Sequence, residues 1–392
     1  MSGAFGSDTG QIVLLRGGDP MALARRTLDE RAAGRIPLLG DDRWSEQQWK
    51  VVQDRVDAAG PQPGQAWAAL SSGSTGEPRI VLRTADSWAA SFSHVAELLD
   101  AGPDDVLALS SPPASSLSLF SIAHSAEAGF TLALPRAHSL TAEDARDASL
   151  FHGTPNGLRT LLDADTPSRL RAALIGGTSL DLALRARAEA QGIRVISYYG
   201  AAELSFVAID DVRADDAGGR GFRAFPGVEF ELRDDDVLWV HSPYVSTGYL
   251  TGTGPMRQGA GWCTVGDRAR LEEGRLTLLG RDDDAILTAG ATVIPADVEQ
   301  ELRRIDGVDD AVVFGLPNDG VGELVTAVIE AAPGSSLRRA ELRADAASRL
   351  PATHLPRRWF VVDHLPRTVT GKTARAELIH RVRSGEVASL AR

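Results

Sequence analysis

The chain has 392 residues, a formal net charge of −12, 43% hydrophobic and 24% charged residues, and one cysteine, Cys263. This length exceeds what one compact core usually holds, so we expect two domains. The negative net charge argues against a nucleic-acid binder, because phosphate backbones attract basic surfaces. One cysteine excludes an intramolecular disulfide framework and suits a reducing cytosol. The start, MSGAFGSDTGQIVLL, lacks a basic region before an apolar core, and no apolar run nears the ~18–20 residues of a membrane span. We therefore expect a cytoplasmic protein.

Apolar runs alternate with amphipathic stretches over about the first two hundred residues. Asp19 and Pro20 are a candidate N-cap and first residue of a helix, and Ser45 with Gln48 forms a candidate capping box for the next one. Buried strands are expected at Gln11–Leu15, Ile36–Leu39, Val106–Leu109, Phe130–Leu134, Ala173–Ile175 and Val195–Tyr198. This alternation predicts an α/β fold whose mostly parallel sheets are flanked by helices, with ligands bound beyond the carboxyl ends of the strands.

The pattern changes from about Phe222 to Leu279, where short strand-like runs are separated by turns rich in glycine and aspartate. This favours a β-rich subdomain of the large domain. The polar run after Arg281 predicts a hinge near Asp283. Beyond it, a helix over Pro295–Ile305, two apolar strands, a helix near Leu337–Leu350 and the strand WFVV predict a small α+β domain. We place the boundary between residues 1–282 and 283–392.

A segment rich in glycine and hydroxyl side chains follows the strand-like run AWAAL. It consists of Ser71, Ser72, Gly73, Ser74, Thr75 and Gly76, and continues with Glu77-Pro78-Arg79. Two glycines let backbone N–H groups converge, so this segment can wrap a polyphosphate, although a plain surface turn has the same composition.

Several other site signatures are missing from the sequence. The GK[ST] at Gly371-Lys372-Thr373 has Pro366 where a P-loop needs glycine, and there is no dinucleotide-binding fingerprint, HExxH, CxxC or GxSxG. The histidines have no metal-ligand spacing. P-loop, zinc hydrolase and serine hydrolase functions are therefore disfavoured.

Six segments in order resemble the motifs of the adenylate-forming superfamily of acyl-CoA synthetases, nonribosomal peptide adenylation domains and luciferases. They are SSGSTGEPR from Ser71, IGGTSL from Ile175, YGAAE from Tyr199, GWCTVGD from Gly261, GRDDD from Gly280 and LPRTVTGK from Leu365. The chain most closely resembles compact bacterial fatty-acyl- or o-succinylbenzoate–CoA ligases and, compared with the family, starts near the first strand–helix–strand unit of the large domain. The resemblance implies a large domain followed by a small mobile lid, and an enzyme that activates a carboxylic acid with ATP and then acylates a thiol.

The resemblance also implies a role for each matching residue. Catalysis would depend on Lys372, Glu203 and Thr75, with Glu203 binding Mg²⁺ and Lys372 bridging the substrate carboxylate and α-phosphate. Residues 71–76 would hold the outer phosphates, and the nucleotide would also contact Gly176, Gly177, Thr178, Tyr199, Gly200, Ala201, Asp267 and Arg281. In this set Tyr199 would stack on adenine, while Asp267 and Arg281 would hold the ribose. Without the resemblance, Tyr199 reads as a core aromatic and Lys372 as an exposed loop lysine.

The sequence departs from the family pattern at four places: Arg79 replaces a lysine, Ala202 and Val265 each replace a threonine, and the histidine or aromatic gate near PLxH is replaced within residues 111–116. Three functions stay open: a carboxylic acid–CoA ligase, an adenylating enzyme that loads an acyl or peptidyl carrier protein or another acceptor, and a nucleotide- or acyl-binding protein that has lost catalysis. The cofactors would be ATP, Mg²⁺ and coenzyme A or carrier pantetheine, and a homodimer is also open. The acid's tail is expected near Leu117, Leu119, Phe120 and Phe206.

Overall fold

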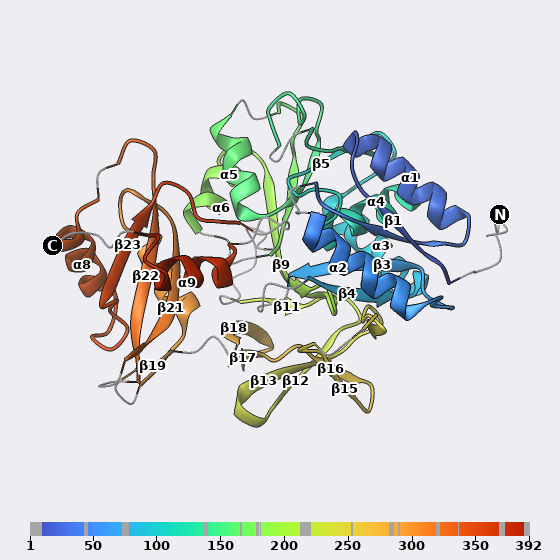
Figure 1. Ribbon diagram of the computed structural model, residues 1–392. Helices are drawn as coiled ribbons and strands as arrows, with labels where there is room; N and C mark the ends of the chain where they lie inside the picture. Colours follow the sequence, from blue (N-terminus) through green and yellow to red (C-terminus); the bar gives the residue numbers. More distant parts are fainter. Residues whose placement is uncertain are drawn as a thin grey trace.

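The computed structural model describes residues 10–42, 46–72, 78–136, 140–164, 167–177, 180, 182–211, 221–251, 254–281, 286–288, 291–318, 322–335, 337–367 and 373–387. The chain forms a large unit up to residue 281 and a C-terminal unit from residue 286, which is orange to red in Figure 1 and lies beside the large unit. No helix within these ranges combines the length and apolar character that a membrane crossing requires.

The first sheet of the large unit combines parallel and antiparallel strands. In sheet order these are β1 (Ile12–Leu15), β2 (Ile36–Leu39), β3 (Trp67–Ser72), β4 (Pro78–Arg83) and β14 (Gly248–Tyr249). Three helices follow strands of this sheet in the chain: α1 (Pro20–Ala32) follows β1, α2 (Glu46–Ala59) follows β2, and α3 (Ala85–Leu99) follows β4. The predicted start of α1 is confirmed, because the Asp19 carboxylate accepts a hydrogen bond from the Ala22 amide at 2.8 Å and Pro20 is the first helical residue. Ser45 lies outside the described residues.

The second sheet is parallel from β6 to β9 and antiparallel beyond. In sheet order its strands are β11 (Arg223–Ala224), β10 (Ser205–Asp210), β9 (Arg194–Ala201), β8 (Ala172–Ile175), β7 (Leu150–Gly153), β5 (Val106–Leu109) and β6 (Thr131–Ala133). Helix α4 (Ser116–Ala128) packs with α3 in the core between the two sheets, since α4 contacts both β3 and β7. Helices α5 (Pro155–Asp163) and α6 (Leu182–Glu189) cover the other face. The predicted α/β layering is confirmed.

A third, antiparallel sheet lies below the first two in Figure 1. It is built from β12 (Glu229–Arg233), η1 (Asp234–Asp236, a 3-10 turn), β13 (Val237–His241), β15 (Arg257–Gly259), β16 (Trp262–Thr264), β17 (Asp267–Glu272) and β18 (Arg275–Arg281). The predicted β-rich subdomain is thus confirmed. Two short strands of this part of the chain were not predicted and join the larger sheets: β11 pairs with β10, and β14 pairs with β4.

The C-terminal unit is a sheet with helices on both faces. Its strands are β19 (Ile286–Thr288), β20 (Ala291–Val293), β21 (Val308–Asn318), β22 (Gly322–Ala331) and β23 (Arg358–Val362). Helices α7 (Pro295–Leu302) and α8 (Arg339–Arg349) share one core, and α9 (Arg375–Arg383) packs into another. The guanidinium of Arg159 on α5 lies 3.7 Å from the Asp309 carboxylate on β21, so an ion pair joins the two units. The expected boundary at Asp283 lies outside the described residues.

Some predicted boundaries were wrong. Strand β9 continues three residues past Tyr198 to Ala201, because β10 pairs with it antiparallel up to Ser205 opposite Ala201. Helix α7 ends at Leu302 rather than Ile305, and Gly307 then takes the positive φ of 83° that turns the chain into β21. Strand β7 and helix α9 were not predicted.

Candidate active site

The predicted phosphate-binding segment begins in β3 and leads into β4, and these two strands pair antiparallel. Ser71 and Ser72 are still in β3, where Ser71 pairs with Arg79 and Ser72 with Pro78. Strand β3 therefore continues two residues beyond the expected strand-like run AWAAL, which ends at Leu70. Residues 73–77, including the predicted Gly73, Ser74, Thr75 and Gly76, lie outside the described residues, as does the Ser72 side chain.

The Ser71 hydroxyl has the environment expected of a ligand-binding group. Its Oγ is buried and has no hydrogen-bond partner among the described residues. The neighbouring Leu70 forms a bridge with Ser115, the N-cap of α4, so the hairpin lies beside the loop that follows β5. A buried hydroxyl without a partner costs free energy, and a phosphate oxygen would supply the missing acceptor.

The predicted adenine loop follows the carboxyl end of β8, where the open-sheet rule places ligands. Gly177 has a φ of 92°, which an L-residue with a side chain adopts only under strain. At Gly176, an added β-carbon would lie 2.2 Å from the Tyr198 ring, so the backbone of this loop rests directly on that ring. Thr178 lies outside the described residues.

Two nucleotide-binding candidates from different sheets meet at the end of β9. The Tyr199 hydroxyl donates a hydrogen bond of 2.5 Å to Oδ2 of Asp267, 68 residues away. Asp267 opens β17 directly opposite Arg281, the last residue of β18. The backbone thus gathers the predicted adenine and ribose residues at one place, although nothing is described of the Arg281 side chain.

Gly200 and Ala201 form the last two positions of β9, beside Tyr199. A β-carbon at Gly200 would lie 2.2 Å from the Ser205 carbonyl oxygen on β10. Only glycine allows that close approach, so this residue sets the tight turn that carries Glu203. Ala201 pairs with Ser205 on the other side of the same turn.

Glu203 is a buried carboxylate, only 5% exposed, in the turn between β9 and β10. Its Oε1 accepts a hydrogen bond of 2.9 Å from the Tyr249 hydroxyl on β14. Its own carbonyl oxygen accepts a 2.7 Å hydrogen bond from the Ser246 amide. Burial, followed by the Glu203 charge and hydrogen bond, raises the pKa of Tyr249, so the phenol stays a neutral donor to the carboxylate.

Two residues at Glu203 were not predicted from the sequence: Tyr249 and Arg83. Arg83 ends β4 and is fully buried, and its guanidinium donates to the carbonyl oxygens of Ala202 and Tyr244, each at 2.6 Å. The available signal was an arginine within the otherwise apolar run IVLR, where a buried cation needs a specific partner.

The side chains expected to line a pocket for the acid's tail are mostly packed in the core. Leu119, Phe120 and Phe206 are 1%, 4% and 3% exposed, and the two phenylalanine rings make an edge contact with centroids 5.0 Å apart. Phe206 also contacts the Tyr198 ring at 4.6 Å. These three side chains therefore fill the space between α4 and β9, and the expectation that they line an open pocket is corrected.

A polar chain crosses the same region beneath α4. The Ser121 hydroxyl lies 2.8 Å from His152 Nδ1, and His152 Nε2 lies 3.0 Å from the Tyr198 hydroxyl. Burial lowers the pKa of His152 to about 3, so its imidazole is neutral and can donate from one nitrogen while accepting at the other. Tyr198 is the partly exposed end of this chain, next to Gly176.

The loop that carries the predicted catalytic lysine is closed at its base. Arg367 forms an isolated bridge with Thr373, and the Ala374 amide donates to the Pro366 carbonyl at 2.7 Å. The Arg367 guanidinium lies 3.1 Å from both Asp310 and Glu330 on neighbouring strands. Lys372 itself lies outside the described residues.

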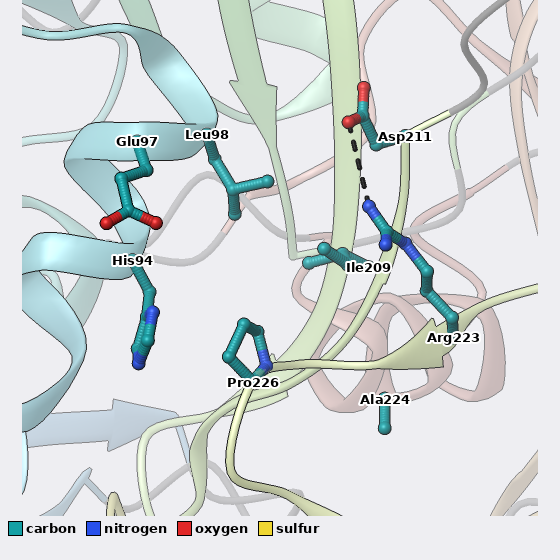
Figure 2. Close-up of a pocket in the computed structure, with 8 residues that line it drawn as sticks. All are labelled: His94, Glu97, Leu98, Ile209, Asp211, Arg223, Ala224 and Pro226. Atoms are coloured by element: carbon teal, nitrogen blue, oxygen red, sulfur yellow. Dashed lines mark ion pairs between the residues drawn. The ribbon is translucent and has the colours of Figure 1, made fainter.

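One cavity of about 460 Å³ lies away from these residues. Figure 2 shows α3 on one side of it and β10 with β11 on the other; it is lined by His94, Glu97, Leu98, Ile209, Asp211, Arg223, Ala224 and Pro226. The Asp211 carboxylate lies 3.7 Å from Arg223 and 2.6 Å from Arg194, the first residue of β9. Arg194 is at the amino end of β9, whereas Glu203 lies just beyond its carboxyl end. The cavity is therefore at the opposite end of the strand from Glu203 and is separate from the candidate site.

The described residues fit ATP and Mg²⁺. The Ser71 hydroxyl, without a partner among the described residues, suits a phosphate oxygen. Tyr249 holds Glu203 Oε1, and within the same part of the chain no hydrogen bond to Oε2 is seen, which suits a hard cation. Among the described residues, no cluster of three or more histidine, cysteine, aspartate or glutamate side chains could hold a metal ion.

Known proteins are similar to this chain over most of its length. The sequence profile "AMP-binding enzyme" matches residues 18–250, and "AMP-binding enzyme C-terminal domain" matches residues 297–372. A protein of Mycobacterium tuberculosis named "Probable 2-succinylbenzoate–CoA ligase" is 31% identical over 388 residues, covering 94% of this chain and 93% of its own.

Two solved structures share the fold. ATP-bound MatB from Rhodopseudomonas palustris superposes with a TM-score of 0.80 at 20% identity, covering 97% of this chain and 89% of its own. MenE from Bacillus subtilis, an o-succinylbenzoate coenzyme A synthetase in complex with ATP and magnesium ion, gives 0.78 at 20% identity, covering 95% and 90%.

The fold and the matching relatives define an AMP-forming acid–thiol ligase. The chain belongs to the AMP-binding enzyme family, in both its large and its C-terminal parts.

Proposed function

We propose that this protein activates a carboxylic acid with ATP, releases pyrophosphate, and transfers the acyl group from the resulting acyl-adenylate to coenzyme A. The observation that carries the proposal is the hydrogen bond between Tyr199 and Asp267. It joins the segments expected to bind adenine and ribose at the strand end from which Glu203 follows. The 2-succinylbenzoate–CoA ligase name of the Mycobacterium tuberculosis relative supports coenzyme A as the acceptor.

The chemistry has two displacements at one site. In the first, an oxygen of the substrate carboxylate forms a bond to the α-phosphorus of ATP as the bond to the bridging oxygen breaks, and pyrophosphate leaves with the electron pair. In the second, the thiolate of coenzyme A attacks the acyl carbon and AMP leaves. When bound, Mg²⁺ would neutralise charge on the phosphate oxygens during the first displacement.

The chain's own residues have separate tasks in the first step. Ser71 would donate to a phosphate oxygen, Glu203 would hold the cation, and Asp267 would accept hydrogen bonds from the ribose hydroxyls. Because the Tyr199 hydroxyl also donates to Asp267, that carboxylate is held in place before the nucleotide arrives.

A pyrophosphate-release screen over a library of carboxylic acids, with and without coenzyme A, tests this function. We expect at least one acid to give ATP-dependent pyrophosphate release, and coenzyme A to raise its turnover and yield AMP and a thioester. If no acid releases pyrophosphate, the proposed chemistry is wrong. If release is unaffected by coenzyme A but a phosphopantetheine carrier is acylated, the activation step holds and coenzyme A is the wrong acceptor.

We further propose that the C-terminal unit rotates about a hinge at Asp283 between the two displacements. Proline at this position fixes φ and removes an N–H donor, which restricts a hinge. We therefore expect Asp283→Pro to retain most of the pyrophosphate-release rate while losing more than about tenfold in thioester formation. The two half-reactions are measured separately, the second from preformed acyl-adenylate. Equal losses in both would show that Asp283 has only a structural role.

A further inference from the structure

Arg83 is a buried cation that contacts the segments on both sides of Glu203. The side chain is 0% exposed and, within the described part of the chain, no carboxylate oxygen lies within 4.0 Å of it. Its Nε and Nη2 donate to the Ala202 carbonyl at 3.2 and 2.6 Å, and its Nη1 donates to the Tyr244 carbonyl at 2.6 Å. The guanidinium also lies over the Trp88 ring, 5.4 Å from its centroid.

Hydrogen bonds among the described residues fix Glu203 and the residue before it at three points. The residue before it is bound by Arg83 through the Ala202 carbonyl. Its own carbonyl is bound by Ser246 and its carboxylate by Tyr249. Arg83 also binds the carbonyl of Tyr244, and Ser246 and Tyr249 follow Tyr244 in the chain. Tyr249 in turn pairs with Val81 in β4, the strand that ends at Arg83. One guanidinium therefore links the phosphate-binding hairpin to both segments that fix the carboxylate.

The charge of Arg83 has a second effect. Burying a carboxylate is costly, and a cation in the same low-dielectric interior offsets part of that cost. Burial lowers the pKa of Arg83 to about 9, while attraction to Glu203 opposes that shift, so the guanidinium is charged at neutral pH and the two groups stabilise each other. A neutral side chain of similar length would remove both the hydrogen bonds and this attraction.

We propose that Arg83 is a positioning residue that holds the Glu203 turn in register with the phosphate-binding hairpin, so that the carboxylate is ready to bind the magnesium ion of the bound nucleotide. The proposal rests on the proposed function of this site as a nucleotide and metal site. Arg83 touches no reacting atom in this role and acts through the Ala202 carbonyl. Loss of such supporting contacts typically costs about 10- to 100-fold in metal affinity or activity.

Arg185 offers a matched control. It is also a buried arginine, 7% exposed, and its guanidinium binds the Val195 carbonyl at 3.0 Å, Ser197 at 3.1 Å and Asp210 at 3.0 Å. These partners lie toward the other ends of β9 and β10, away from Glu203. Arg185→Met therefore removes a buried cation and its hydrogen bonds without altering the support of the proposed metal ligand.

The test compares Arg83→Met, Arg83→Lys and Arg185→Met by calorimetric titration with ATP, with and without Mg²⁺, alongside pyrophosphate release against Mg²⁺ concentration. We expect Arg83→Met to weaken the Mg²⁺-dependent part of ATP binding by about tenfold or more and to raise the half-saturating Mg²⁺ similarly, with metal-free ATP binding unchanged. Arg83→Lys keeps the charge but loses the forked geometry, so we expect an intermediate loss. Arg185→Met should lower thermal stability and leave the Mg²⁺ dependence at the wild-type value.

Wild-type Mg²⁺ dependence in folded Arg83→Met would overturn the proposal, and so would an equal loss in Arg185→Met. If Arg83→Met does not fold, Arg83→Lys decides the matter, since its Mg²⁺ dependence must shift for the proposal to stand. The binding titration also separates this proposal from the proposed function. A wild-type protein that binds ATP with Mg²⁺ but activates no acid would contradict the function, while the Arg83 comparison would still give its answer.

Discussion

Replacing Lys372 with alanine should slow acyl-adenylate formation by roughly 100- to 1000-fold, which is the usual cost of losing one preorganised donor at a reacting oxyanion. Lys372 is about 170 residues beyond Glu203, in a loop whose base is closed by the Arg367–Thr373 bridge. A lysine there would deliver a point charge to the α-phosphate and the substrate carboxylate. Once the acyl-adenylate exists, that charge has no further task. The variant should therefore make thioester from preformed acyl-adenylate at a near-normal rate.

The split between the half-reactions is the informative measurement. Misfolding would lower both rates together, whereas loss of the lysine should lower only the first. Lys50→Ala is the matched control, because the Lys50 ammonium is exposed on α2 and pairs only with Asp54 among the described residues, at 2.9 Å. It should leave both rates unchanged. Equal losses in a folded Lys372→Ala, or no loss, would remove Lys372 from the catalytic set.

Glu203→Gln should reduce acid-dependent pyrophosphate release by about 100-fold at limiting Mg²⁺. Glutamine keeps the shape of the side chain and can still accept the hydrogen bond from Tyr249. It lacks the negative charge that a hard cation prefers, so the fold should survive while metal binding weakens. Raising Mg²⁺ should recover part of the rate.

An exposed carboxylate provides the comparison for this variant. Glu229 begins β12 on the third sheet and is exposed, so Glu229→Gln changes the net charge equally without touching the site. Its release rate should match that of the wild type at every Mg²⁺ concentration. Unchanged release by Glu203→Gln at limiting Mg²⁺ would mean that the cation is bound elsewhere.

Local signals in the sequence predicted much of the fold. Asp19 and Pro20 mark the start of α1 because a side-chain acceptor and a residue without an N–H donor satisfy the same helix end. The apolar run Ile36–Leu39 is buried throughout, as a central parallel strand requires. Strand pairing left no such local mark, so the join of β14 to the distant β4 and the extension of β9 along its neighbour β10 were missed.

The residues of the candidate site also fall into those that local sequence motifs predicted and those that they did not. Tyr199 and Asp267 were predicted from their motifs, and the structure brings them into contact. Arg83 and Tyr249 were missed because their importance depends on a three-dimensional neighbour, Glu203, rather than on their own surroundings in sequence. The expected pocket lining was wrong for a related reason. Phe120 and Phe206 are apolar enough to line a pocket, but their rings pack against each other instead.

The ion pair between Arg159 and Asp309 bears on how readily the two units change their relative orientation. Its side chains are 25% and 27% exposed and the charged atoms are 3.7 Å apart. Such partly solvated pairs contribute roughly 0–1 kcal/mol, which biases two orientations by no more than about fivefold. A ligand that binds the other orientation about tenfold more tightly outweighs that bias. In the proposed rotation, coenzyme A would need only about that preference for the other orientation to outweigh the contribution of this one ion pair.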